Sequence, residues 1–135
     1  MVCIDYSCHF LDGKFSPELV HEKTGLRFDK AEEAGQIGKL GKYRNKPQPY
    51  GAAVIRVPDN VSYEKKIAWL AKQVQPNLPM IRRCGATRIY VDEAIYHDGQ
   101  CNLAFESEEL KLLSDFGLPF CVSVYEGKEI SIERS

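Results

Sequence analysis

The sequence lacks a hydrophobic run long enough to cross a membrane, and it lacks a Cys-x-x-Cys pair. A membrane-spanning helix needs about 18 or more apolar residues, so we expect no membrane span. No basic segment followed by an apolar stretch opens the chain, so we also expect no secretory signal. The five cysteines are an odd number and fit neither a disulfide framework nor a zinc site. These absences predict a cytoplasmic protein with reduced, mostly buried thiols and without metal or cofactor.

Composition predicts one globular domain over residues 1–135, with 44% hydrophobic and 27% charged residues. The net charge of −1 is unevenly divided along the chain. Residues 1–88 hold 15 Lys and Arg against 9 Asp and Glu, a balance of +6, whereas residues 89–135 hold 3 against 10, a balance of −7. Either the two parts interleave in space and cancel, or the surface is bipolar and its acidic region suits a basic partner.

The stretch CIDYSCHF, residues 3–10, has the pattern of a strand rather than of a chemical site. Apolar residues alternate with small or polar ones, and the apolar ones are Val2, Ile4, Tyr6, Cys8 and Phe10. Such alternation is typical of a strand with one face on the core and one toward water. Cys8 therefore points inward and Cys3 outward, which excludes a metal site that uses both.

Asp5, Ser7 and His9 share the polar face of this strand and are residue types used in nucleophilic catalysis. Side chains two residues apart on a strand stand roughly 6.5 to 7 Å from each other, since each residue advances the chain by about 3.3 Å. A nucleophile and its base need about 2.6 to 3.2 Å. We therefore expect a solvated or partner-facing row here, and a hydrolytic enzyme using these residues is the third functional hypothesis.

The remaining elements follow from periodicity and from capping and turn residues. Apolar alternation and continuous apolar runs predict further strands over 50–57, 87–96 and 120–125, with an optional edge strand over 129–133. The Asp98-Gly99 pair predicts a hairpin into a strand over 101–106. Capping signals and apolar stripes predict helices over 17–24, 62–75, 77–85 and 107–116. Residues 29–49 are expected to form a long loop with a helical turn at 30–34.

This order of elements predicts an α+β fold, a two-layer sandwich whose mixed, mostly antiparallel sheet carries helices on one face. A ferredoxin-like core with an added strand and helix is one candidate arrangement. The element order, Gly-Lys-Tyr-Arg at 41–44 and the ending EELKLLSDFGLPFCVSVYE resemble an uncharacterised bacterial family of small α+β domains of unknown function. The resemblance covers residues 3–126; it implies the fold and no catalytic residue.

The loop GQIGKLGKYRNK, residues 35–46, combines three glycines with four cations. Glycine-rich backbone beside cations can hold a phosphate, and an aromatic ring can stack on a base. The loop lacks the GxxxxGK[ST] motif and an acidic partner for magnesium. It supports the second hypothesis, a nucleotide- or nucleic-acid-binding module that uses Lys39, Lys42, Tyr43 and Arg44; the alternative is a solvated loop.

The sheet face away from the helices carries tyrosines, carboxylates and small polar residues, which resembles a recognition surface more than a hydrolytic pocket. Its expected members are Asp5, Ser7, His9, Tyr90, Asp92, Tyr96, Ser123 and Tyr125. Trp69, on the polar side of the helix over 62–75, is either a further interface anchor or covered by the segment before residue 50. The leading hypothesis is a protein-binding module, in its finer form an immunity or inhibitor protein that blocks a toxin or enzyme. An enzyme is not expected, and Asp92 and Glu93 point to opposite faces, so they form no acid/base pair.

Overall fold

The computed structural model describes residues 2–39 and 41–126. Its strands are β1 (Val2–Asp12), β2 (Lys30–Glu32), β3 (Gly51–Arg56), β4 (Arg88–His97) and β5 (Phe120–Glu126). Its α-helices are α1 (Pro17–Thr24), α2 (Lys66–Val74), α3 (Leu78–Arg83) and α4 (Ser107–Phe116). Short 3-10 helices occur at η1 (Gly41–Tyr43), η2 (Tyr63–Lys65) and η3 (Gln75–Asn77). The edge strand predicted over 129–133 lies outside the described residues.

The five strands form one mixed sheet in the order β2-β3-β1-β4-β5. The pairs β2–β3, β3–β1 and β1–β4 are antiparallel, whereas β4–β5 is parallel and is connected through α4. The first strands and helices thus follow the βαββαβ order of a ferredoxin-like core, and α4 with β5 is the added helix and strand. The predicted fold class is confirmed, including its mostly antiparallel sheet.

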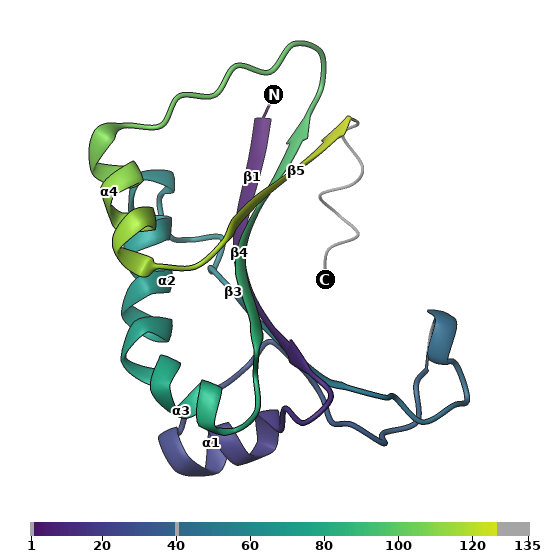
Figure 1. The fold of residues 1–135 in the computed structure, drawn as a ribbon. Coiled ribbons are helices and arrows are strands. Elements are labelled where there is room, and N and C mark those ends of the chain that lie inside the picture. Colours follow the sequence, from purple (N-terminus) through teal and green to yellow (C-terminus); the bar gives the residue numbers. More distant parts are fainter. Residues whose placement is uncertain (1, 40, 127–135) are drawn as a thin grey trace.

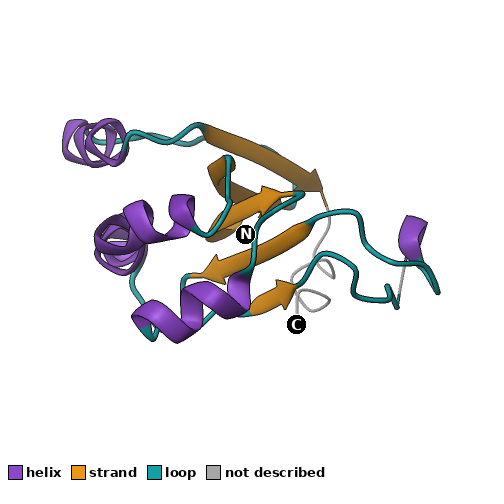
Figure 2. Ribbon diagram, turned by 60° about the horizontal axis from the view of Figure 1, so that its bottom comes forward, coloured by secondary structure: helices purple, strands orange, loops and turns teal. Residues whose placement is uncertain are grey.

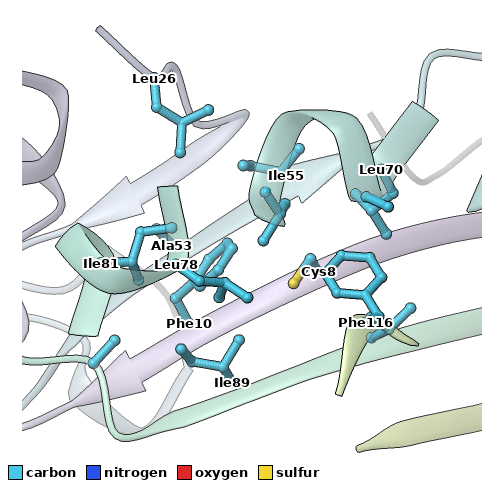
Figure 3. Close-up of a cluster of buried hydrophobic side chains, with 14 of the residues drawn as sticks. Cys8, Phe10, Leu26, Ala53, Ile55, Leu70, Leu78, Ile81, Ile89 and Phe116 are labelled. Carbon is cyan, nitrogen blue, oxygen red and sulfur yellow. The ribbon is translucent and has the colours of Figure 1, made fainter. Parts of the chain in front are cut away.

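The helices lie along one face of this sheet, which gives the two predicted layers (Figures 1 and 2). β1 runs through the middle and turns Tyr6, Cys8 and Phe10 toward the helices, where all three are buried. Leu70 of α2 and Ile81 of α3 are fully buried in the same cluster (Figure 3). The predicted alternation of β1 is confirmed over residues 6–10, whereas Ile4 is half-buried and Val2 is exposed.

Local signals explain the ends of α1. Ser16 accepts a hydrogen bond at its side chain from the backbone N–H of Leu19, and Pro17 occupies the first turn. Gly25 ends the helix with φ of 76°, a left-handed conformation that glycine adopts at little cost. The helix predicted over 17–24 is confirmed at both ends.

The helical region 63–83 is continuous, whereas the sequence predicted two helices, over 62–75 and 77–85, separated at Pro76. Ser62 makes no side-chain capping bond, and Pro76 does not stop the helical path, because it lies in the first turn of η3, where proline is tolerated. The expected apolar stripe is confirmed, since α2 buries Ile67, Leu70, Ala71 and Val74.

Two local predictions are wrong. The segment expected to form a helical turn at 30–34 contains β2, in which Lys30 is paired with Val54 of β3. The segment 101–106 is not a strand, although Gly99 does form the expected turn with φ of 82°. A hairpin strand after this turn would need the free edge of β4, but β5 occupies that edge in parallel register. The segment 101–106 instead leads into α4.

Candidate functional site

The sheet face opposite the helices brings together most of the residues predicted to bind a partner. Ser7 of β1 lies between two charged residues, since its cross-strand neighbours are Arg56 of β3 and Asp92 of β4. His9 is opposite Tyr90 of β4. This face is called the open face below, because no helix among the described residues lies on it (Figure 1).

Ser7 and His9 are in direct contact. The Ser7 hydroxyl oxygen and His9 Nε2 are 2.9 Å apart, a hydrogen-bonding distance. The spacing of 6.5 to 7 Å expected from the strand rise is therefore wrong for the side-chain ends, because both side chains rotate toward each other from backbone positions two residues apart. The Ser7 hydroxyl and the His9 ring are therefore close enough for a contact between a nucleophile and its base.

The His9 ring is held flat against Tyr90. The two ring centroids are 4.8 Å apart and the planes differ by 4°. The Arg88 guanidinium lies 5.6 Å from the centre of the Tyr90 ring. Burial lowers the pKa of His9 below its ordinary value of 6.5, with the nearby charge of Asp92 acting in the opposite direction. The neutral imidazole is therefore the main form of His9 near pH 7.

A second aromatic pair lies further along β4. The rings of Tyr96 and Tyr125 stack with centroids 5.2 Å apart and planes that differ by 17°. Burial raises the pKa of Tyr96, so its hydroxyl keeps its proton at neutral pH. Next to this pair the Ser123 hydroxyl donates a hydrogen bond of 3.1 Å to the carboxylate of Asp92. Stacked rings of this kind offer contact area that loses little conformational freedom on binding.

A groove of about 420 Å³ runs over the open face. The predicted residues that line it are Asp5, Ser7, His9, Asp92, Tyr96 and Tyr125. Sequence reasoning missed Asp29, Lys30 and Arg56, which also line it. The sequence holds a signal for Arg56, because this residue stands between the apolar Ile55 and Val57 in a predicted strand and so points to the opposite face.

Asp5 differs from the rest of its row. Only 9% of Asp5 is exposed, whereas Ser7 and His9 are half-buried. The row is therefore not evenly solvated as predicted, and its end at Asp5 is covered.

Trp69 does not join the open face. It belongs to α2 in the helix layer, is half-buried and packs against the core cluster. The sheet lies between this side chain and the groove. An interface anchor at Trp69 would therefore be separate from the open face, because α2 covers the other face of the sheet (Figure 1).

The glycine-rich loop connects β2 to β3 and extends beyond the sheet on the side away from the helices (Figure 1). Its turn is closed by hydrogen bonds from Gly38 N–H to the Lys46 carbonyl, 3.0 Å, and from Asn45 N–H to the Gly38 carbonyl, 2.8 Å. A Cβ at Gly38 would overlap the carbonyl oxygen of Tyr43, so this position requires glycine. Backbone hydrogen bonds and the close contact at Gly38 therefore determine the shape of the loop. The loop leads into β3 and not into an α-helix whose first turn could hold a phosphate.

The cations of this loop are exposed, and its tyrosine is engaged. Lys39, Lys42 and Arg44 are all exposed. The Lys42 ammonium lies 5.6 Å from the centre of the Tyr43 ring, which also packs edge-on against Tyr50 at 5.9 Å. A base stacking on Tyr43 would compete with these contacts.

The described parts of the chain contain neither a cluster of metal ligands nor a disulfide. No group of three or more His, Cys, Asp or Glu residues there is arranged to hold a metal ion. All five cysteines are free thiols, and Cys8 and Cys84 are buried. Within the same residues, no helix has the length and apolar character that a membrane crossing requires.

Comparison with protein-family models, with curated proteins and with solved structures gave no match.

Proposed function

We propose that the open face binds another protein. The observation that carries this proposal is a pair of aromatic stacks, His9 with Tyr90 and Tyr96 with Tyr125, on the open face; His9, Tyr96 and Tyr125 line its groove, which no helix of the described residues covers. Protein interfaces concentrate their binding energy in a few tyrosine, tryptophan and arginine residues surrounded by polar groups. The groove supplies this combination, with carboxylates and Arg56 around the rings.

Charge supports a basic partner. Residues 89–135 hold 3 Lys and Arg against 10 Asp and Glu, and β4 and β5 of the open face belong to this part. A lysine or arginine of the partner can lie over the Tyr96–Tyr125 pair and approach Asp92. The finer form of the proposal is an immunity or inhibitor protein that blocks a toxin or enzyme in the cytoplasm; it is supported by the small size, the acidic second part and the groove.

Capture from a native lysate tests this proposal with matched variants. The wild-type chain should retain a protein that the double variant Tyr96→Ala/Tyr125→Ala does not retain. Leu110→Ala is the control, because Leu110 is 52% exposed but lies on α4 in the helix layer. Retention of the same proteins by wild type and double variant would contradict binding at the open face.

Nucleic-acid binding by the loop is the alternative, supported by its exposed cations. Phosphate binding of this kind weakens steeply with salt, because bound cations are released from the nucleic acid. We expect the wild-type chain to show little affinity for single-stranded RNA or mononucleotides, since Tyr43 is already engaged by Tyr50. Micromolar, salt-sensitive binding that disappears in Lys39→Ala/Lys42→Ala/Arg44→Ala would move the alternative to first place.

A further inference from the structure

The contact between Ser7 and His9 is also an arrangement that can form a covalent bond. A serine becomes nucleophilic when a base accepts its proton, and the two groups must be within about 2.6 to 3.2 Å. The Ser7 hydroxyl and His9 Nε2 are 2.9 Å apart at the groove. With the ring proton on Nδ1, Nε2 is the acceptor, so Ser7 donates toward the atom that would take its proton.

The surroundings of His9 favour its role as a base. The parallel stack on Tyr90 fixes the plane of the imidazole. Burial lowers the His9 pKa, which keeps the ring neutral at neutral pH, and in the tautomer with its proton on Nδ1 the Nε2 atom is free to accept a proton. Asp92, whose charge favours the imidazolium, is available to stabilise His9 after it has accepted a proton.

Arg56 supplies positive charge next to Ser7. The two residues are cross-strand partners in β1 and β3, and neighbouring strands stand about 4.8 Å apart. The Arg56 backbone N–H is bonded to Asp29, at 2.6 Å, but among the described residues its guanidinium has no hydrogen bond or ion pair. Because its N–H groups are not engaged by other described residues, the guanidinium of the half-buried Arg56 can stabilise an oxyanion that forms at a carbonyl attacked by Ser7.

We propose that Ser7 is a nucleophile toward small activated esters, with His9 as its general base and Arg56 as the group that stabilises the oxyanion. The Ser7 oxygen forms a bond to the ester carbonyl carbon while its proton passes to His9 Nε2. The tetrahedral intermediate then loses the alcohol or phenol, which takes that proton, and leaves an acyl-Ser7. Water, deprotonated by His9, attacks the acyl group and releases the acid, and Ser7 recovers its proton. This activity is independent of protein binding and goes beyond the proposed function.

Labelling with an alkyl fluorophosphonate tests the proposal directly. The Ser7 oxygen would bond to phosphorus, fluoride would leave, and the proton would go to His9. We expect one adduct per chain by intact mass, located on Ser7 by peptide mapping, and none on Ser7→Ala. His9→Gln should slow labelling by about 100-fold or more, the range for losing a general base. Ser62→Ala should leave the rate unchanged, because Ser62 is exposed and makes no capping bond.

The pH dependence of labelling distinguishes a base from a structural contact. The rate should rise with a single ionisation whose midpoint lies below 6.5. The charged and titratable groups that share the groove with His9 or flank its stacking partner are Arg88, Tyr90, Asp92 and Tyr96 on β4, Asp5 on β1, Arg56 on β3, Tyr125 on β5, and Asp29 and Lys30 at β2. Asp92→Asn should move the midpoint further down, because Asp92 favours the protonated ring.

Arg56→Gln provides the last arm of the experiment. It should slow labelling of Ser7 by about tenfold, because a neutral amide replaces the positive charge at the oxyanion. The pH midpoint should not fall, because loss of a positive charge does not favour the neutral His9 ring. No adduct on Ser7, or equal rates for wild type and His9→Gln variants that unfold at the same urea concentration, would overturn the proposal. Partner capture by the open face is measured separately, so either proposal can fail alone.

Discussion

Replacing Glu93 by glutamine is expected to raise the free energy of unfolding near pH 8 by about 1 kcal/mol or more, because burying an ionised carboxyl without a cation costs more than burying a neutral amide. Glu93 lies on the helix-facing side of β4 and is 0% exposed. Among the described residues, the Tyr6 hydroxyl is the neutral polar group beside this carboxyl, but neither it nor either carboxylate oxygen completes a well-formed hydrogen bond. The amide keeps the shape of the side chain but carries no charge, so it removes most of this cost.

The size of this effect should depend on pH. Burial raises the pKa of Glu93 above its ordinary value of 4.5; the Tyr6 hydroxyl opposes this shift, and the charges of Glu109 and Asp92 add to it. A raised pKa means that the folded state favours the protonated carboxyl. Its favourable contribution is complete below about pH 4.5 and is lost as pH rises through the pKa of the folded state. Wild type should therefore lose stability with rising pH relative to Glu93→Gln.

Urea unfolding of both proteins between about pH 5 and pH 8 measures this difference. Glu108→Gln is the matched control, because Glu108 is exposed on α4 and its replacement should change stability by at most about 0.5 kcal/mol. A difference between wild type and Glu93→Gln that stays constant over this pH range would contradict an ionisable Glu93 in the core.

Phe10→Ala is expected to lower the free energy of unfolding by about 3–5 kcal/mol, the range for truncating a buried phenylalanine. The Phe10 side chain is 0% exposed. Its ring lies 6.5 Å from that of Phe15 and 5.7 Å from that of Phe28, so the truncation leaves a cavity bordered by two other rings. Urea unfolding at neutral pH measures the loss.

The opposite side of the same strand gives the control for Phe10. Ser7→Ala removes one half-buried hydroxyl and its hydrogen bond to His9, which should cost at most about 1 kcal/mol. Similar losses for Phe10→Ala and Ser7→Ala would mean that the two faces of β1 are equally packed. The open face would then need a covering layer.

The two faces of β1 were predictable because they depend only on neighbours along the chain. Alternation over residues 2–10 places Tyr6, Cys8 and Phe10 on the core side and Ser7 and His9 on the other, and the structure confirms this placement. Helix ends were predictable where a local signal exists, as for Ser16 and Gly25 around α1.

Long-range pairing was not predictable. The strand expected over 101–106 has a correct turn signal at Gly99, yet β5 takes the edge of β4 that it needed. β2 has only three residues, too few for an alternating pattern to be visible in the sequence. It forms a strand because it pairs with the edge of β3. Both outcomes depend on pairing between residues that are 20 or more positions apart, which local periodicity does not contain.

The site was predicted as a set of residues but not as a geometry. The alternation of side chains along the strands predicted that Ser7, Asp92, Tyr96 and Tyr125 share one face. All four line the groove. The Ser7–His9 contact was missed because backbone spacing fixes where a side chain starts, while its rotation fixes where it ends.

The affinity of the captured partner for chain variants tests the role of the open face most directly. Calorimetric titration should give a dissociation constant at least tenfold weaker for Tyr96→Ala/Tyr125→Ala than for wild type, a loss of about 1.4 kcal/mol or more. Leu110→Ala in the helix layer should bind as wild type does. Unchanged affinity of the tyrosine variant together with weakened binding by Leu110→Ala would contradict the account and place the interface on the helices.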